Sequence, residues 1–168
     1  MLYQITVPFF SKTLKNLSHM LDKAQKLADG KKFEVEVLLN SRLAPDQFNF
    51  IRQVQITCDT AKLAVARLSG KEAPKNEDTE KSLPELKARI DHTLQYLNSV
   101  TEKDFAGAET KKITHARWED KHLTGFDFAF HHALPNLYFH TTTAYSILRH
   151  NGVELGKQDF LGEMPFKK

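Results

Sequence analysis

The segment from Leu134 to Gly162 constrains the fold most, because it combines an amphipathic helix, a marked helix end and an apolar tail. Pro135 suits the first turn of a helix, where its missing N–H is no loss. Gly152 suits the left-handed position that follows a helix. Apolar side chains recur between them at the spacing of one helical face, at Leu137, Ala144 and Leu148. This segment therefore predicts a helix over 135–150 and a docked tail.

Three further segments show the same helical spacing of apolar residues, at 7–28, 46–69 and 83–101. Thr6 and Gly30 are expected to begin and end the first of these helices. Asp46 can cap the second. The sequence Ser-x-x-Glu at 82–85 predicts a capping box at the start of the third.

The connections between these helices differ in character. The segment 70–81 is polar and predicts a surface linker. Residues 102–132 contain the alternating sequences KKITHARW and HLTGFDFAF, which are typical of a β-hairpin. That alternation would place Phe126, Phe128 and Phe130 on one side. The sequence therefore predicts an all-α up-down four-helix bundle, with a small β-hairpin before the last helix, in a single domain spanning 1–168.

Composition limits the classes of partner. The chain has 24 basic and 21 acidic residues mixed along its length, for a formal charge of +3, and it lacks a concentrated basic run. We therefore expect no nucleic-acid partner. No signal-peptide pattern or run of about 18 apolar residues occurs, so we expect no membrane partner and a cytoplasmic location. Cys58 is the only cysteine, which excludes an intrachain disulfide.

Three phrases carry a resemblance to a known family: VPFFSKTLKNLSHMLDKA, LLNSRLAPDQFNFIRQVQITCDTAK and LPNLYFHTTTAYSILRHNGVELGKQDFLG. The chain resembles an uncharacterised bacterial and fungal family within the DinB/YfiT-like four-helix-bundle superfamily. In that superfamily the resemblance implies a divalent metal, often nickel or zinc. The metal is held by one histidine on the second helix and a His-x-x-x-His pair that opens the last helix. Some members carry out thiol-dependent transferase or isomerase chemistry.

Only part of this ligand set is present in the chain. The second histidine of the pair falls on His140, whereas the first falls on Asn136. No histidine occurs between His19 and His92, so the second helix has none. The resemblance therefore implies a degenerate metal site, with His140 as its one ligand. We therefore expect no cofactor. The alternative is that His140 binds a divalent metal ion, nickel or zinc.

His140 is the central candidate residue, because helical geometry points it into the bundle. Gln53, Thr57 and Asn136 are expected to line the same cavity, although amide and hydroxyl groups are poor substitutes for imidazole as zinc ligands. A hydrogen-bonded core histidine is the favoured interpretation, and a metal or catalytic role is the alternative. A joint site of His132 and His140 would require the last helix to begin earlier, which Pro135 disfavours.

The second apolar face of the helix at 46–69, formed by Ile56 and Leu63, predicts burial against another surface. Two functions follow from these features. The first is a homodimeric module that binds a ligand or a partner. The alternative is a metal-dependent, thiol-type transferase or isomerase that acts on a small molecule in a pocket around His140. Cys58 is expected to be inert, since a mid-helix thiol on an apolar face has nothing to lower its pKa.

Overall fold

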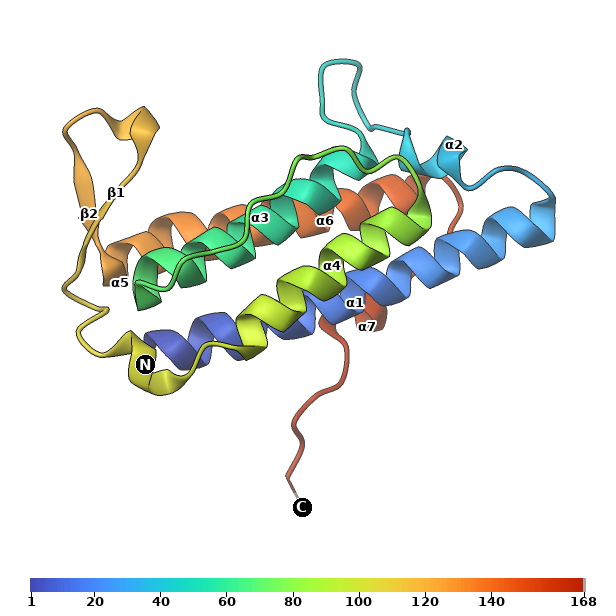
Figure 1. The fold of residues 1–168 in the computed structure, drawn as a ribbon. Coiled ribbons are helices and arrows are strands. Elements are labelled where there is room, and N and C mark those ends of the chain that lie inside the picture. The colour runs from blue at the N-terminus through green and yellow to red at the C-terminus, as the bar shows by residue number, and fades with distance from the viewer. Residues whose placement is uncertain (168) are drawn as a thin grey trace.

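The computed structural model describes residues 1–167 and contains four long helices packed around one core (Figure 1). These helices are α1 (Leu2–Lys31), α3 (Phe50–Ser69), α4 (Leu83–Asn98) and α6 (Leu134–His150). The stripes predicted from the sequence form the core. On α3, for example, the buried residues include Phe50, Val54, Cys58, Ala61, Val65 and Leu68. The predicted four-helix bundle is confirmed.

Short elements connect the long helices or follow the last of them. They are α2 (Glu36–Leu39), a 3₁₀ turn (Glu102–Phe105), β1 (Lys112–Thr114), a second 3₁₀ turn (Ala116–Trp118), β2 (His122–Thr124), α5 (Gly125–Phe128), a π-helical turn (Ala129–Ala133) and α7 (Lys157–Leu161). Strands β1 and β2 pair antiparallel, with Ile113 opposite Leu123. The predicted hairpin is therefore present. The tail docks as predicted, since the Asn16 side chain on α1 donates a hydrogen bond to the carbonyl of Phe160 on α7 (2.8 Å).

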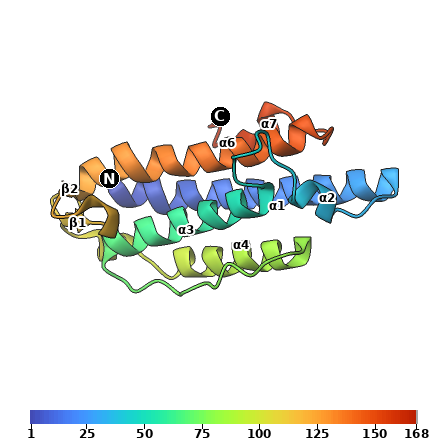
Figure 2. The same cartoon turned by 90° about the horizontal axis from the view of Figure 1, so that it is seen from above.

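The linker 70–81 determines the directions of the helices. It runs back along the bundle, so α3 and α4 point the same way while α1 and α6 point the opposite way (Figures 1 and 2). Its first residues lie beside the end of α4, where Lys71 Nζ donates to the carbonyl of Ser99 (3.1 Å). Its last residues lie beside Arg89, near the start of α4.

Arg89 fastens this linker to the bundle. Its side chain is only 2% exposed and pairs with Asp59 on α3 (2.9 Å) and with Asp78 and Glu80 of the linker (both 2.8 Å). A buried guanidinium needs such partners, because an unpaired charge is costly to remove from water. The segment predicted as a surface linker is thus an ordered strap, held by ion pairs.

Several predicted helix ends are corrected. Helix α1 begins at Leu2, and Thr6 lies inside it, buried, with its hydroxyl donating to the carbonyl of Leu2 (2.6 Å). Gly30 also lies inside α1, which ends where Lys32 adopts a left-handed conformation. The N-cap of α3 is Asn49, whose side chain accepts from the backbone N–H of Arg52, so Asp46 is too early. The predicted capping box of Ser82 and Glu85 is confirmed.

The largest correction concerns the segment before α6. Strand β2 ends at Thr124, whose side chain caps α5 by accepting from the N–H of Asp127. Helix α6 begins at Leu134 with Pro135 in its first turn, as predicted. However, α5 and the π-helical turn lead into it without a break, so residues 125–132 are helical and do not belong to the hairpin as predicted. The wider turn accommodates a proline that has no N–H to donate to the preceding turn. Phe128 is buried, while Phe126 and Phe130 are not, so the three rings do not share one side.

No helix within residues 1–167 combines the length and the apolar character needed to span a membrane.

Candidate functional site

A groove of about 570 Å³ lies between α3 and α6 and reaches the hairpin. Its walls combine apolar, aromatic and basic side chains. The lining residues are Phe48, Arg52, Ile56, Asp59, Thr60, Leu63, Ala64, Arg67, His115, Arg117, Trp118, Phe128, His132, Ala133, Asn136 and His140. Ile56 and Leu63, the second apolar face of α3, thus form part of the wall.

His140 lies at one end of this groove. Its Nδ1 atom is 2.7 Å from Oε1 of Gln53 on α3. The Gln53 amide is oriented by its own Nε2, which donates to the carbonyl of Phe48 (3.0 Å). Oε1 must therefore accept, so Nδ1 carries the proton and Nε2 keeps a lone pair.

The electrostatic surroundings of His140 favour this neutral form. Burial lowers the pKa of the imidazole, and the nearby Arg52 guanidinium lowers it further. A neutral imidazole with an unprotonated Nε2 can accept a hydrogen bond, take a proton or bind a metal ion. His140 is thus the buried, hydrogen-bonded histidine expected from the sequence, and it also borders the groove.

The other predicted site residues lie in two different places. Asn136 lines the groove one turn before His140, and its side-chain nitrogen donates to Oγ1 of Thr60 (2.7 Å). Thr57 is fully buried beneath the groove, where its hydroxyl donates to the backbone carbonyl of Gln53 (2.8 Å). The structure therefore brings His140 and Gln53 into contact, places Asn136 beside them and leaves Thr57 as a support.

These residues do not fit the metal site that the resemblance implies. Across residues 1–167, no group of three or more His, Cys, Asp or Glu side chains is arranged to hold a metal ion. Asn136 occupies the position of the first histidine, and its amide is engaged by Thr60. His132 does lie in helical structure and lines the same groove, contrary to the argument from Pro135. However, it lies two helical turns before His140, about 12 Å along the axis.

The hairpin end of the groove contains a basic cluster that the sequence did not reveal. It consists of Arg67 on α3, His115 and Arg117 on the hairpin, and His132 on the π-helical turn. The His132 ring stacks on Phe128 (5.3 Å between centroids) and meets the edge of Trp118 (5.3 Å). The rings of His115 and His132 lie 6.2 Å apart.

The members of this basic cluster influence one another. Burial lowers the pKa of His132, and the positive charges of His115 and Arg67 add to the effect. Burial likewise lowers the pKa of His115, with further contributions from Arg67 and Arg117. Burial also lowers the pKa of Arg67, whose guanidinium lies 5.8 Å from the ring centre of Phe128. The only sequence signal was the number of basic residues, because the cluster joins three separate segments.

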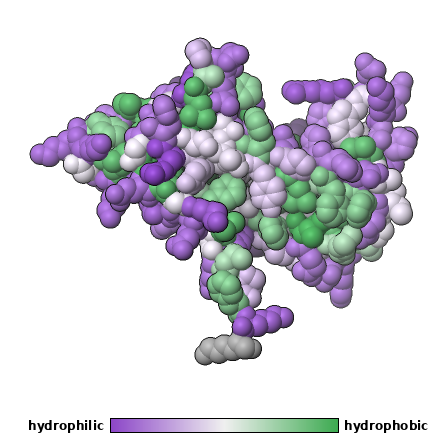
Figure 3. Space-filling model, turned by 180° about the vertical axis from the view of Figure 1, so that it is seen from behind, coloured by the Kyte–Doolittle hydropathy of each residue, from purple (hydrophilic) through white to green (hydrophobic). Residues whose placement is uncertain are grey.

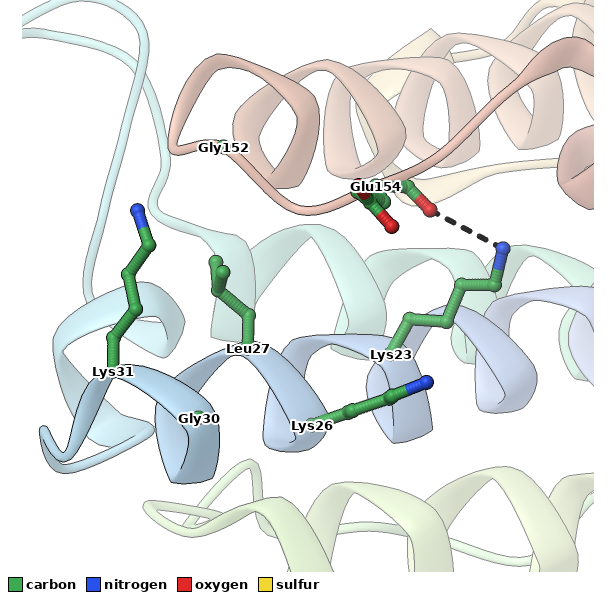
Figure 4. Close-up of a pocket in the computed structure, with 7 residues that line it drawn as sticks. All are labelled: Lys23, Lys26, Leu27, Gly30, Lys31, Gly152 and Glu154. Atoms are coloured by element: carbon green, nitrogen blue, oxygen red, sulfur yellow. Dashed lines mark hydrogen bonds between the residues drawn. The ribbon is translucent and has the colours of Figure 1, made fainter.

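Other candidate features have structural explanations. Cys58 is fully buried, and burial raises the pKa of its thiol to about 12, which makes it a packed, unreactive side chain. A second hollow, of about 520 Å³, lies between α1 and the start of the tail (Figure 4). There Lys23 donates to the carbonyl of Glu154 (3.2 Å) and pairs with Asp159 (2.7 Å), so its charge is already compensated.

An exposed apolar area lies elsewhere on the molecule. Figure 3 shows it on the side hidden in Figure 1, towards the end that carries the hairpin. Phe126 and Phe130 belong to this end, are 41% and 38% exposed, and have ring centres 4.6 Å apart. Neither residue lines the groove.

Comparison with solved structures defines the class of the protein. A crystal structure of a DinB family member protein from Shewanella denitrificans is 60% identical in sequence, and the match covers 100% of this chain and 96% of that chain with a TM-score of 0.97. The fold is therefore that of a DinB-like helical bundle, as the resemblance predicted. The model of the family described as Domain of unknown function (DUF1993) matches residues 2–161, and the chain belongs to this family. A search of curated proteins gave no match.

Proposed function

We propose that this protein is a ligand-binding module whose groove between α3 and α6 holds a small organic molecule. One observation carries the proposal: two helices and the hairpin together line a groove of about 570 Å³ with aromatic, apolar and basic side chains. Ligand sites are typically hollows of this size, mainly apolar, with a few fixed polar groups.

The polar groups of the groove are held in place before any ligand arrives. Gln53 fixes His140, and Thr60 fixes Asn136. Such preorganisation favours binding, because less side-chain freedom is lost when the ligand is bound. Trp118, Phe128 and Phe48 supply flat surfaces on which an aromatic or apolar body can rest.

Binding can be tested with benzyl alcohol and benzenesulfonate as probes, followed by backbone amide NMR shifts. We expect shifts concentrated on α3, α6 and the hairpin. Asn136→Trp should fill the groove and abolish these shifts, whereas Asn98→Trp, at the exposed end of α4, should preserve them. The proposal is wrong if neither probe perturbs the groove, or if Asn136→Trp binds both probes as the wild type does.

The homodimer predicted from Ile56 and Leu63 is part of this proposal, with the rim of the groove near the subunit contact. Leu63 remains 39% exposed, which supports it. Wild type should sediment as a dimer, and Leu63→Lys should sediment as a monomer. A wild type that sediments as a monomer would remove the dimer from the proposal while leaving ligand binding intact. The cytoplasmic location also stays a prediction.

The alternative function is a metal-dependent transferase or isomerase with His140 in its pocket. It is supported by the free Nε2 of a neutral imidazole at the groove, and it is weakened by the incomplete donor set. Metal analysis of protein purified without an affinity tag distinguishes the two functions. Stoichiometric nickel or zinc that is lost in His140→Ala would favour the enzyme, and metal-free wild type would reject a strong site at His140.

A further inference from the structure

The basic cluster at the hairpin end of the groove consists of Arg67, His115, Arg117 and His132, and it gathers positive charge without a matching carboxylate. Among residues 1–167, none of the four forms a salt bridge with Asp or Glu. Besides burial, the charges that lower the pKa of the two imidazoles come from the cluster: Arg67 and Arg117 act on His115, and His115 and Arg67 act on His132.

The carboxylate in the groove wall does not compensate this cluster. Asp59 is held by Lys62 (3.1 Å) and by Arg89 (2.9 Å), both of which are almost completely buried. Arg67 instead lies over the face of Phe128. A half-buried guanidinium that faces an open groove without an anionic partner is left with unused hydrogen-bond donors.

We propose that this end of the groove binds the oxyanion group of the ligand, a carboxylate, sulfonate or phosphate, while the ligand's apolar body rests against Trp118 and Phe128. This inference rests on the proposed function and adds the chemical class of the ligand. Arg67 supplies a planar fork that matches an oxyanion, and Arg117 and the two imidazoles supply further donors. Trp118 and Phe128 flank the site with rings whose centres lie 6.3 Å apart, and such apolar walls strengthen an electrostatic attraction.

Binding is coupled to protonation. An anion beside His115 and His132 favours their charged forms, so it raises both pKa values and takes up protons. The charged groups that act on these imidazoles are Arg67 from α3 and Arg117 from the hairpin. Asp59, the carboxylate of the groove wall, is already paired. Affinity for an anion should therefore increase as the pH falls from about 8 to about 6.

Benzenesulfonate is a suitable probe, because its charge stays constant over this pH range, and benzyl alcohol is its neutral counterpart. Titration calorimetry should show that Arg67→Met weakens benzenesulfonate binding about tenfold or more, the effect of losing one charged hydrogen-bonding partner. Benzyl alcohol binding should be retained. Arg149→Met, an exposed position at the end of α6, should change neither affinity. If Arg67→Met does not fold, Arg117→Met on the exposed hairpin provides the same test.

A second readout follows the histidines directly. The C2–H NMR signals of His115 and His132 should titrate at higher pH when benzenesulfonate saturates the protein. Unchanged titration, or equal benzenesulfonate affinity in the folded arginine variants, would overturn the oxyanion site. Benzyl alcohol binding without tighter benzenesulfonate binding would reject this inference alone, whereas failure of both probes in wild type would reject the proposed function itself.

Discussion

Gln53 and His140 join α3 to α6 through a hydrogen bond of 2.7 Å between residues 87 positions apart in the sequence. Gln53 is 1% exposed, so no water can take the place of the imidazole as the hydrogen-bond donor to its amide oxygen. The same bond sets which nitrogen of His140 faces the groove with a lone pair. One polar contact therefore contributes both to the packing of the bundle and to the chemistry of the candidate site.

Removing either partner of this bond should destabilise the protein. We expect His140→Ala to lower the free energy of unfolding by about 1 to 3 kcal/mol, because it orphans the Gln53 oxygen and leaves a small cavity. Gln53→Leu should have an effect of similar size. Urea unfolding measures both, with His92→Ala on the exposed face of α4 as the control. Equal urea midpoints for wild type and His140→Ala would contradict a structural role.

Arg89→Leu should release the strap formed by residues 70–81. The substitution leaves Asp59, Asp78 and Glu80 without their shared cation, and loss of one partner of a buried ion pair typically costs about 3 to 5 kcal/mol. Trypsin should then cleave the strap at its lysines well before the helices. Arg42→Leu, at an exposed position, is the matched control. A variant as resistant to trypsin as wild type would show that the strap is held by other contacts.

Two glycines should respond in opposite directions to the same substitution. A Cβ at Gly125 would lie 1.8 Å from the backbone oxygen of Ala108, so Gly125→Ala must displace backbone and should cost about 2 kcal/mol or more. At Gly30, inside α1, nothing lies within 4 Å of the added atom. Gly30→Ala should therefore stabilise the protein by about 0.5 to 1 kcal/mol. The unfolding temperatures of the two variants, compared with that of the wild type, check both predictions. A Gly125→Ala variant as stable as the wild type would refute the close approach of Gly125 to the backbone of Ala108.

Stability should decrease as the pH falls from about 7.5 to about 5.5. Burial lowers the pKa values of His132 and His140 in the folded protein, so in this range the unfolded chain binds more protons than the folded chain. Protons therefore favour unfolding until the folded-state pKa values are reached. The double variant His132→Gln and His140→Gln should show a weaker pH dependence in urea midpoints. An identical slope in wild type and variant would contradict this assignment.

The helical framework could be predicted because it is encoded locally. The apolar stripes, the capping box of Ser82 and Glu85, and the left-handed Gly152 each depend on residues within a few positions of one another. The segment after β2 was mispredicted, because the alternation of Phe126, Phe128 and Phe130 also fits a short helix followed by a wide turn. Burial of Phe128 in the core and the geometry around Pro135 favour the short helix and wide turn over a strand.

The site was predictable only at its His140 end. A helical wheel places His140 and Gln53 on inward faces, so their meeting follows from two helices that pack together. The basic cluster could not be found in this way, since Arg67, His115 and His132 come from three segments whose contact depends on where the hairpin folds. The strap was missed for a related reason: Asp78 and Glu80 look like solvated charges until Arg89 is known to be buried beside them.

The groove depends on walls that are far apart along the chain. Helix α3 ends at Ser69 and α6 begins at Leu134, with the strap, α4 and the hairpin between them. During synthesis α3 emerges long before α6, so the groove does not yet exist in a nascent chain that has only its first wall. The groove is accordingly complete only once α6 has emerged, and any fragment that stops before α6 lacks it altogether.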